Sequence, residues 1–289
     1  MTIGFISSGD AHRLASKKSV NISGMVSQCF SRYAGAVLLL VATLGVSVDA
    51  QTWPPATSVP NAPHPQESVT IREIPVNFWK DQGAIWSSPG RIRDDNLGYL
   101  IPLGLAVAGA ITTDHQAMSE VVSHNRSFNN RNTNASNVLT SPFIAAPAVL
   151  FAAGHFGSND HARETGILGG EAILDSLVVE QSIKLMFWRE RPTVDGAKGK
   201  FFQTNAGWDS SFPSSHSVIA WSSAAVLADE YPSGLNQLGI YTIATGVSLA
   251  RVLGQQHFPS DVLVGSAVGW MVGHYVYKKH HRWHSEISR

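Results

Sequence analysis

The chain has 289 residues, with 21 basic and 21 acidic side chains, so its formal net charge is zero. Without a basic excess, we expect no nucleic-acid partner. Charged residues make up only 15% of the chain and apolar residues 44%, where a soluble protein typically carries about 25% charged residues. The mean hydropathy is near zero, well short of a protein built from long apolar spans. The single cysteine, Cys29, excludes an intrachain disulfide and a multi-cysteine metal site.

The first 50 residues resemble a segment that directs export. Residues 34–48 form an apolar run that follows Lys17, Lys18 and Arg32 and leads to small residues around Ala50. This order predicts a secretory signal peptide over residues 1–50. The run is short for a membrane-spanning helix, which needs about 20 apolar residues, although an uncleaved N-terminal anchor is the alternative. In either case we expect the rest of the chain to lie outside the cytoplasm, periplasmic or secreted, with membrane association left open.

The next segment, residues 51–96, joins this N-terminus to the main body. Its first part, residues 51–66, is rich in proline and has no apolar periodicity, which indicates a flexible linker. Its second part, residues 67–96, is mixed in composition and predicts a short extension that lies on the core. The expected packing anchors are its large apolar side chains, Phe78, Trp79, Ile85 and Trp86.

From residue 97 the chain alternates between apolar segments and polar breaks. Residues 97–113 predict a helix, and residues 121–137, with six asparagines, predict a loop. Residues 138–154 contain Pro142 and Pro147, so a helix there should be broken or kinked.

Four further helices are expected at residues 164–190, 214–229, 235–250 and 259–278. No stretch shows sustained strand alternation, so the predicted class is all-α, a bundle of about six helices. The predicted catalytic domain covers residues 97–280, and residues 281–289 form a tail. We expect a soluble bundle, because the 164–190 helix carries several charges that are costly in lipid. The helices at 97–113, 235–250 and 260–277 are apolar enough to leave spanning open.

The first chemical motif runs from Lys184 to Pro192. Lys184 and Arg191 are seven residues apart, so they should share one face of a helix that ends near Pro192. Two cations near a helix end suit an anion. Alone, such a pair is better explained as a solvated basic face.

The second motif is Phe212-Pro213-Ser214-Ser215-His216-Ser217, which leads into an apolar run. Proline and serines at this position predict a helix start, where free backbone N–H groups bind phosphate oxygens. His216 would lie in the first turn and act as a general acid. A plain helix cap with an incidental histidine is the alternative.

The third motif runs from Arg251 to Asp261. Pro259 marks a helix start, which places His257 just before the helix and Asp261 in its first turn. The Asp261 carboxylate could then bond one ring nitrogen of His257 and leave the other free to attack, while Arg251 supplies a planar donor fork for phosphate. A structural histidine and a carboxylate that favours the helix N-terminus are the alternatives.

In this order, the three motifs resemble the phosphatidic acid phosphatase type 2 superfamily, which includes bacterial acid phosphatases, lipid phosphatases and vanadium-dependent haloperoxidases. Its signature is Lys-x6-Arg-Pro, then Pro-Ser-Gly-His, then Ser-Arg-x5-His-x3-Asp. The resemblance covers roughly residues 97–278. It implies a phosphatase that hydrolyses phosphate monoesters, either small molecules or lipids, through a phosphohistidine.

The resemblance also implies a role for each matching residue. Lys184, Arg191 and Arg251 would hold the phosphate oxygens, with added hydrogen bonds from Ser214 and the backbone of Ser215. His257 would be the nucleophile, oriented by Asp261, and His216 would protonate the leaving alcohol. Fixed cations would stabilise the developing charge, so no metal or cofactor is expected.

The chain departs from the signature at two positions, and two alternative functions stay open. Ser215 replaces the glycine of the second motif, and Ala250 replaces the serine before Arg251. These changes give weight to a phosphate-binding or structural protein that has lost activity. A vanadium-dependent haloperoxidase, with vanadate as cofactor instead of inhibitor, is the other alternative.

One further motif and one open question remain. The histidine-rich tract at 280–284 resembles a metal-binding segment, but no carboxylate or cysteine partner is evident nearby in the sequence, so we expect a solvated tail. The oligomeric state cannot be read from the sequence.

Overall fold

The computed structural model describes residues 69–204 and 206–282, and this part of the chain is helical without any strand. It contains seven α-helices: α2 (Ile74–Ser87), α3 (Asp94–Gln116), α4 (Arg126–Phe156), α5 (Asp160–Phe187), α6 (Ser215–Glu230), α7 (Gly234–Leu253) and α8 (Pro259–His280). The all-α class is therefore confirmed. The predicted count of about six helices is one short, because the segment predicted as a short extension contains the helix α2. The predicted signal peptide and proline-rich linker lie outside the described residues.

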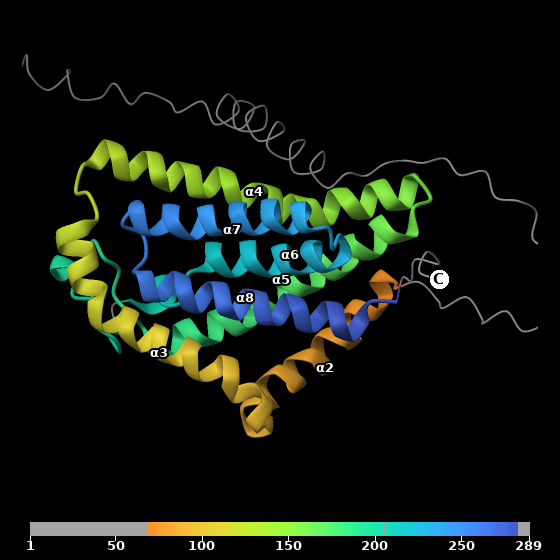
Figure 1. Ribbon diagram of the computed structural model, residues 1–289, viewed down its shortest axis with the longest axis horizontal. Coiled ribbons are helices and arrows are strands. Elements are labelled where there is room, and N and C mark those ends of the chain that lie inside the picture. The colour runs from red at the N-terminus through yellow and green to blue at the C-terminus, as the bar shows by residue number, and fades with distance from the viewer. Residues whose placement is uncertain (1–68, 205, 283–289) are drawn as a thin grey trace, which may run out of the picture.

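The helices α4 to α8 form the bundle, with α6 at its centre (Figure 1). Most residues of α6 are buried, and most of these are small, which lets the neighbouring helices pack closely on all sides. One core cluster joins α6 to α4 and α7, around Phe143, Leu150 and Ile240. A second cluster joins α5, α6 and α8, around Leu168, Val226 and Val276. The central helix is thus held by four others, and its N-terminus is fixed in place.

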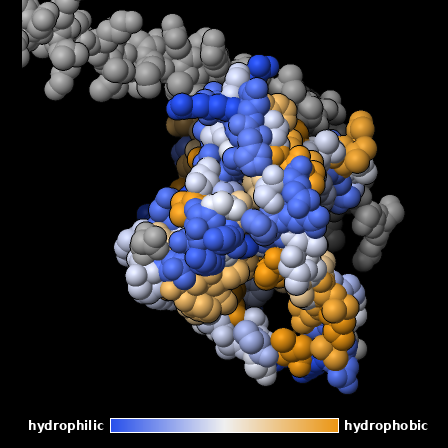
Figure 2. Space-filling view, turned by 90° about the vertical axis from the view of Figure 1, so that its left-hand side faces the viewer, coloured by the Kyte–Doolittle hydropathy of each residue, from blue (hydrophilic) through white to orange (hydrophobic). Residues whose placement is uncertain are grey.

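Two helices lie at the edge of the bundle, where α2 and α3 form a V below it (Figure 1). α2 packs on α5 and α3 on α8. Ile85 packs against the second core cluster as predicted, but Trp79 and Trp86 are 75% and 44% exposed, so their expected role as packing anchors is wrong. Figure 2 shows apolar side chains gathered on this lower part of the molecule, beside a hollow.

Two helical segments are long and apolar enough to cross a membrane on length and composition alone. The first is Asn96–Val121, whose most apolar 18-residue stretch has no buried residue. The second is Arg126–Phe156, in which 39% of the corresponding stretch is buried. Since α4 is a bundle helix that packs on α5 and α7, the exposed apolar surface of α3 is the more unusual feature.

The helix α4 contradicts two sequence predictions. The segment 121–137, predicted as a loop, is largely helical, because Asn125 caps a helix start by accepting a hydrogen bond from the Phe128 N–H at 3.0 Å. The helix then continues through Pro142 and Pro147, both buried. Close packing compensates for the lost backbone hydrogen bonds: a Cβ on Gly166 of α5 would lie only 2.6 Å from the Pro147 carbonyl oxygen. Tertiary contact thus overrides the local preference.

The C-terminal histidine tract is also different from the prediction. His280 is buried, and its Nε2 lies 2.7 Å from the Asp81 carboxylate. His281 lies 3.1 Å from Glu230, and Arg282 pairs with a glutamate of the segment before α2. The carboxylate partners come from distant parts of the chain, so a solvated tail is the wrong description for residues 280–282.

Buried acidic groups surround His280. Burial raises the pKa of Glu171 to about 7, and the neighbouring carboxylates add to this. Burial likewise raises the pKa of Asp175 to about 6. These groups lie in α5, about 20 Å (Glu171) and about 14 Å (Asp175) along the helix from Lys184 at a rise of ~1.5 Å per residue, so they form a cluster separate from the three predicted motifs.

Candidate active site

The three motifs meet at one end of the bundle, where α5 and α7 end and α6 and α8 begin. The pKa of His216 reflects how close the groups of the three motifs lie to one another. Burial and, to a smaller extent, the neighbouring basic groups of Arg251, His257, Arg191 and Lys184 lower the pKa of this imidazole to about 3. All five groups therefore act on one small volume, as the sequence predicts.

Lys184 lies in the last turn of α5 and is 4% exposed. Its Nζ donates to the Ser210 carbonyl at 2.6 Å and lies 3.3 Å from Glu180, one turn earlier in the helix. Burial lowers the pKa of Lys184, while Glu180 opposes that shift. Glu180 thus helps to keep the buried amine cationic, although sequence reasoning gave it no role in the site.

Arg191 reaches the site from a loop instead of a helix. α5 ends at Phe187, because Trp188 takes a left-handed conformation with φ of 37°, so the predicted shared helix face with Lys184 is wrong. The Arg191 guanidinium binds both oxygens of Asp209, at 2.7 and 3.2 Å, and donates to the Gln256 carbonyl at 3.0 Å. This last contact places it beside the residue that precedes His257.

The start of α6 matches the prediction closely. Ser214 is the N-cap, yet no side chain caps the first turn, and its fully buried hydroxyl has no hydrogen-bond partner in the described structure. The Ser215 hydroxyl donates to Glu180 at 2.7 Å. The extra side chain at this non-glycine position is therefore bonded to a neighbouring helix.

His216 lies in the first turn of α6, and its Nε2 is 3.0 Å from Asn137 Oδ1. Asn137 belongs to α4 and lies 3.5 Å from the Arg251 guanidinium as well. The amide oxygen fixes the His216 tautomer with a proton on Nε2. Sequence reasoning missed Asn137 because the segment that holds it was predicted to be a loop.

Arg251 lies in the last turn of α7 and is 6% exposed. One nitrogen donates to Ser136 at 3.2 Å, but its Nε has no partner among the described residues. Burial lowers the pKa of Arg251 to about 10, with a smaller effect from Arg191. Buried donors without partners are rare, and two of them here, on Arg251 and Ser214, suit an absent acceptor such as a phosphate oxygen.

His257 is buried just before α8, as predicted. Its Nδ1 lies 2.8 Å from the Ser211 carbonyl oxygen, whereas the Asp261 carboxylate is 3.7 Å away, too far for the direct hydrogen bond that was predicted. The carbonyl accepts from Nδ1 and so leaves Nε2 as the unprotonated nitrogen. Burial lowers the pKa of His257 to about 4, against the opposing effect of Asp261, so the ring is neutral and able to attack.

Asp261 contributes to the site through its neighbours. One carboxylate oxygen accepts from the Ser211 hydroxyl at 2.5 Å and from the Phe258 N–H at 2.8 Å. The other accepts from Arg189 at 2.7 Å. Asp261 therefore positions the residues on both sides of His257, and it also caps α8 as the alternative interpretation suggested.

Arg189 is the largest omission of the sequence analysis. It is 2% exposed and bonds Asp114 of α3, Asp261 of α8 and the Gly199 carbonyl. Its guanidinium also stacks over the rings of Phe201 and Phe258. A third basic residue between Lys184 and Pro192 was visible in the sequence, but nothing local distinguishes a structural arginine from a ligand-binding one.

Comparison with known proteins shows what this part of the chain is similar to. Residues 166–285 match the PAP2 superfamily, which confirms the resemblance inferred from the three motifs. A 65-residue segment is 37% identical to a lipid A 1-phosphatase from Porphyromonas gingivalis. That segment is 22% of this chain and spans only 15% of the relative's length. No solved structure shows a significant match.

The Arg189 network yields a stability prediction. Arg189→Lys keeps the charge but cannot reach both Asp114 and Asp261, and a buried carboxylate left without its partner costs several kcal/mol. We expect urea unfolding to show a loss of at least about 2 kcal/mol. Arg131→Lys, at an exposed position of α4, is the matched control and should leave the midpoint unchanged. Equal midpoints for the two variants would contradict the role of Arg189.

A second prediction concerns the charge state of His216. Because burial and the nearby basic residues lower its pKa to about 3, the ring should stay neutral from pH 8 down to pH 5 in an NMR titration of the free protein. Saturating inorganic phosphate should raise this pKa, since a bound anion offsets the cations. Arg251→Gln should raise it in the free protein too. A His216 that titrates near 6.5 in the free protein, or whose pKa does not change when phosphate is added, would contradict the geometry.

Proposed function

Since residues 166–285 match the PAP2 superfamily, we propose that this protein is a phosphatase that hydrolyses phosphate monoesters through a phosphohistidine on His257. One observation carries the proposal: two histidines and three basic residues come together, and two buried donors there, Ser214 Oγ and Arg251 Nε, have no partner in the described structure. A tetrahedral anion satisfies both donors and offsets the cations.

The first chemical step follows from the tautomer of His257. Its Nε2 lone pair attacks phosphorus, the bond from phosphorus to the ester oxygen breaks, and a phosphohistidine forms. The leaving oxygen takes a proton from His216. The substrate itself prepares this step, because its negative charge raises the pKa of His216 above the low value of the free site.

The second step regenerates the protein. His216, now neutral, accepts a proton from a water molecule while the water oxygen attacks phosphorus. The bond from phosphorus to His257 Nε2 then breaks, which releases inorganic phosphate. Lys184, Arg191 and Arg251 stabilise the charge on the phosphoryl oxygens throughout. These three cations supply the role that a metal ion plays in other phosphatases, so the proposed reaction is metal-independent. Vanadate can adopt the five-coordinate geometry that phosphorus passes through during the transfer, so it should act as an inhibitor.

We also propose that the substrate carries an apolar chain. A cavity of about 710 Å³ lies between α3, α6, α7 and α8, and its lining is mostly apolar, including Tyr99, Trp221, Leu249 and Trp270. The lining residue Ser248 bonds Ser217, the neighbour of His216, so the cavity adjoins the catalytic end. The named activity of the relative, on lipid A, is in keeping with such a substrate. Export of the chain remains a proposal that rests on residues 34–48.

The nucleophile gives the direct test of the proposed reaction. His257→Asn should lower kcat on a chromogenic phosphate ester by at least ~10³-fold, as expected when the bond-forming group is lost. Phosphate binding should persist, because the cations remain. Rapid acid-free quenching of the wild-type protein with labelled ester should trap label on His257. A variant as active as wild type, or a folded wild-type protein whose initial rate vanishes on adding a chelator, would refute the proposal.

The apolar cavity gives a test of substrate class. Ala267 lines it, and Ala267→Phe should fill part of the volume. We expect kcat/KM for a long-chain phosphatidic acid to fall about tenfold or more, which corresponds to ~1.4 kcal/mol of lost apolar contact. The rate with a small chromogenic ester should not change. Equal effects on both substrates would show that the cavity does not bind the apolar chain of the substrate. The proposed phosphatase activity would be unaffected by that result.

A further inference from the structure

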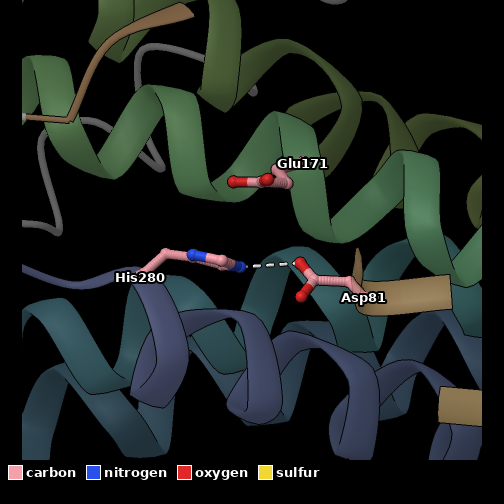
Figure 3. A group of neighbouring side chains, drawn as sticks. All are labelled: Asp81, Glu171 and His280. Atoms are coloured by element: carbon pink, nitrogen blue, oxygen red, sulfur yellow. Dashed lines mark hydrogen bonds and ion pairs between the residues drawn. The ribbon is translucent and has the colours of Figure 1, made fainter. Parts of the chain in front are cut away.

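A second cluster of buried chemical groups lies away from the phosphate site. Asp81 of α2, Glu171 of α5 and His280 of α8 place their ligand atoms within 4.8 Å of one another. Figure 3 shows His280 and Asp81 joined by a hydrogen bond, with Glu171 facing them from the third helix. The three residues come from distant parts of the sequence, so the fold alone brings them together.

The carboxylate of Glu171 lacks an ion-pair or well-formed hydrogen-bond partner among the described residues. Glu171 is fully buried, and neither of its oxygens accepts a hydrogen bond within the described structure. The Asn77 side chain on α2 lies near the carboxylate and lowers its pKa, but this effect is smaller than the rise that burial causes. Buried carboxylates are costly unless they are paired, bonded or bound to a metal. Glu171 therefore points to a missing positive partner.

The charge of the cluster supports the same conclusion. Asp175 is fully buried one turn after Glu171, and its second oxygen is also without a partner in the part of the chain described. Among the described residues, His280 is the only basic group ion-paired with Asp81, and no ion pair reaches Glu171 or Asp175. Three carboxylates against one imidazole leave the cluster short of positive charge.

We propose that Asp81, Glu171 and His280 form a buried site for one divalent transition-metal cation, of which Zn²⁺ is the best match. Two carboxylate oxygens and one imidazole nitrogen are a donor set that Zn²⁺ accepts, and the imidazole disfavours Ca²⁺ and Mg²⁺, which prefer oxygen ligands alone. The cation displaces the proton that His280 Nε2 and Asp81 share. Binding needs only a small movement of these two side chains. Ligand atoms of tetrahedral Zn²⁺ lie about 3.3 Å apart, and His280 Nε2 and the Asp81 oxygen are 2.7 Å apart.

Neighbouring side chains hold the proposed ligands in place. Tyr275 donates to the second oxygen of Asp81 at 3.0 Å, and Gln82 donates to Asp175 at 2.8 Å. Such outer contacts orient ligands in known metal sites. The cation would join α2 and the end of α8 to α5. It is a structural site, about 20 Å along α5 from Lys184 at ~1.5 Å per residue, and takes no part in phosphate chemistry.

The test uses the untagged full chain, first stripped with a chelator and then given Zn²⁺ alone. We expect about one equivalent of tightly bound zinc and a rise in Tm of about 5–10 °C at saturation, the shift that tight binding gives a domain of this size. Glu171→Gln should abolish both effects. The exposed Glu120→Gln is the matched control and should retain them.

A spectroscopic readout keeps the test valid if one variant folds poorly. Co²⁺ in place of Zn²⁺ should give visible absorption bands typical of low coordination number, and these should disappear in Glu171→Gln and in His280→Gln. No bound metal in the wild-type protein, or bands and Tm shifts that persist in Glu171→Gln, would overturn the proposal. Because binding and Tm are measured without substrate, failure here leaves the phosphatase assignment unaffected.

Discussion

The buried ion pairs of Arg189 are the constraint on which the catalytic end depends. One guanidinium bonds Asp114 and Asp261 at 2.7 Å each, which ties α3, the loop after α5 and the start of α8 to one point. Asp261 in turn holds Ser211, whose carbonyl bonds His257. Without Arg189, Asp261 would be a buried charge without its cation, and the tautomer of His257 would lose its support.

This arrangement separates the residues that hold the site together from those that meet a ligand. The carboxylates of Asp261, Glu180 and Asp209 each neutralise one basic residue. Arg251, in contrast, has no carboxylate partner among the described residues, and its Nε is unbonded. Its charge and those of its neighbours act instead on the two histidines, whose pKa values fall to about 3 and 4, chiefly through burial. The concentration of basic groups is thus electrostatically unfavourable by itself, and a bound anion would offset it.

The parts of the fold and of the candidate site that could be predicted are those with a signal in the nearby sequence. Helix starts at Ser215 and Pro259 followed from proline and serine positions, and the spacing of the motifs identified all five groups that meet. The helix through Pro142 and Pro147 depends on close packing against α5, and the left-handed Trp188 that ends α5 early has no signal in the sequence around it. Asn137, Arg189 and the carboxylate partners of His280 could not be recognised, because each acts across more than 70 residues.

The helix α5 explains why two sites can coexist in so small a bundle. Its buried face carries Glu164, Glu171, Asp175, Glu180 and Lys184 at helical spacing, and each must find a partner in the core. Near Lys184, Glu180 contacts the Lys184 amine and the Ser215 hydroxyl, and the other basic residues leave an excess of positive charge that suits an anion. Near Glu171, His280 is the only basic partner of the cluster among the described residues, which leaves an excess of negative charge. The same helix therefore suits the proposed phosphate site at one end and the proposed cation site in its middle.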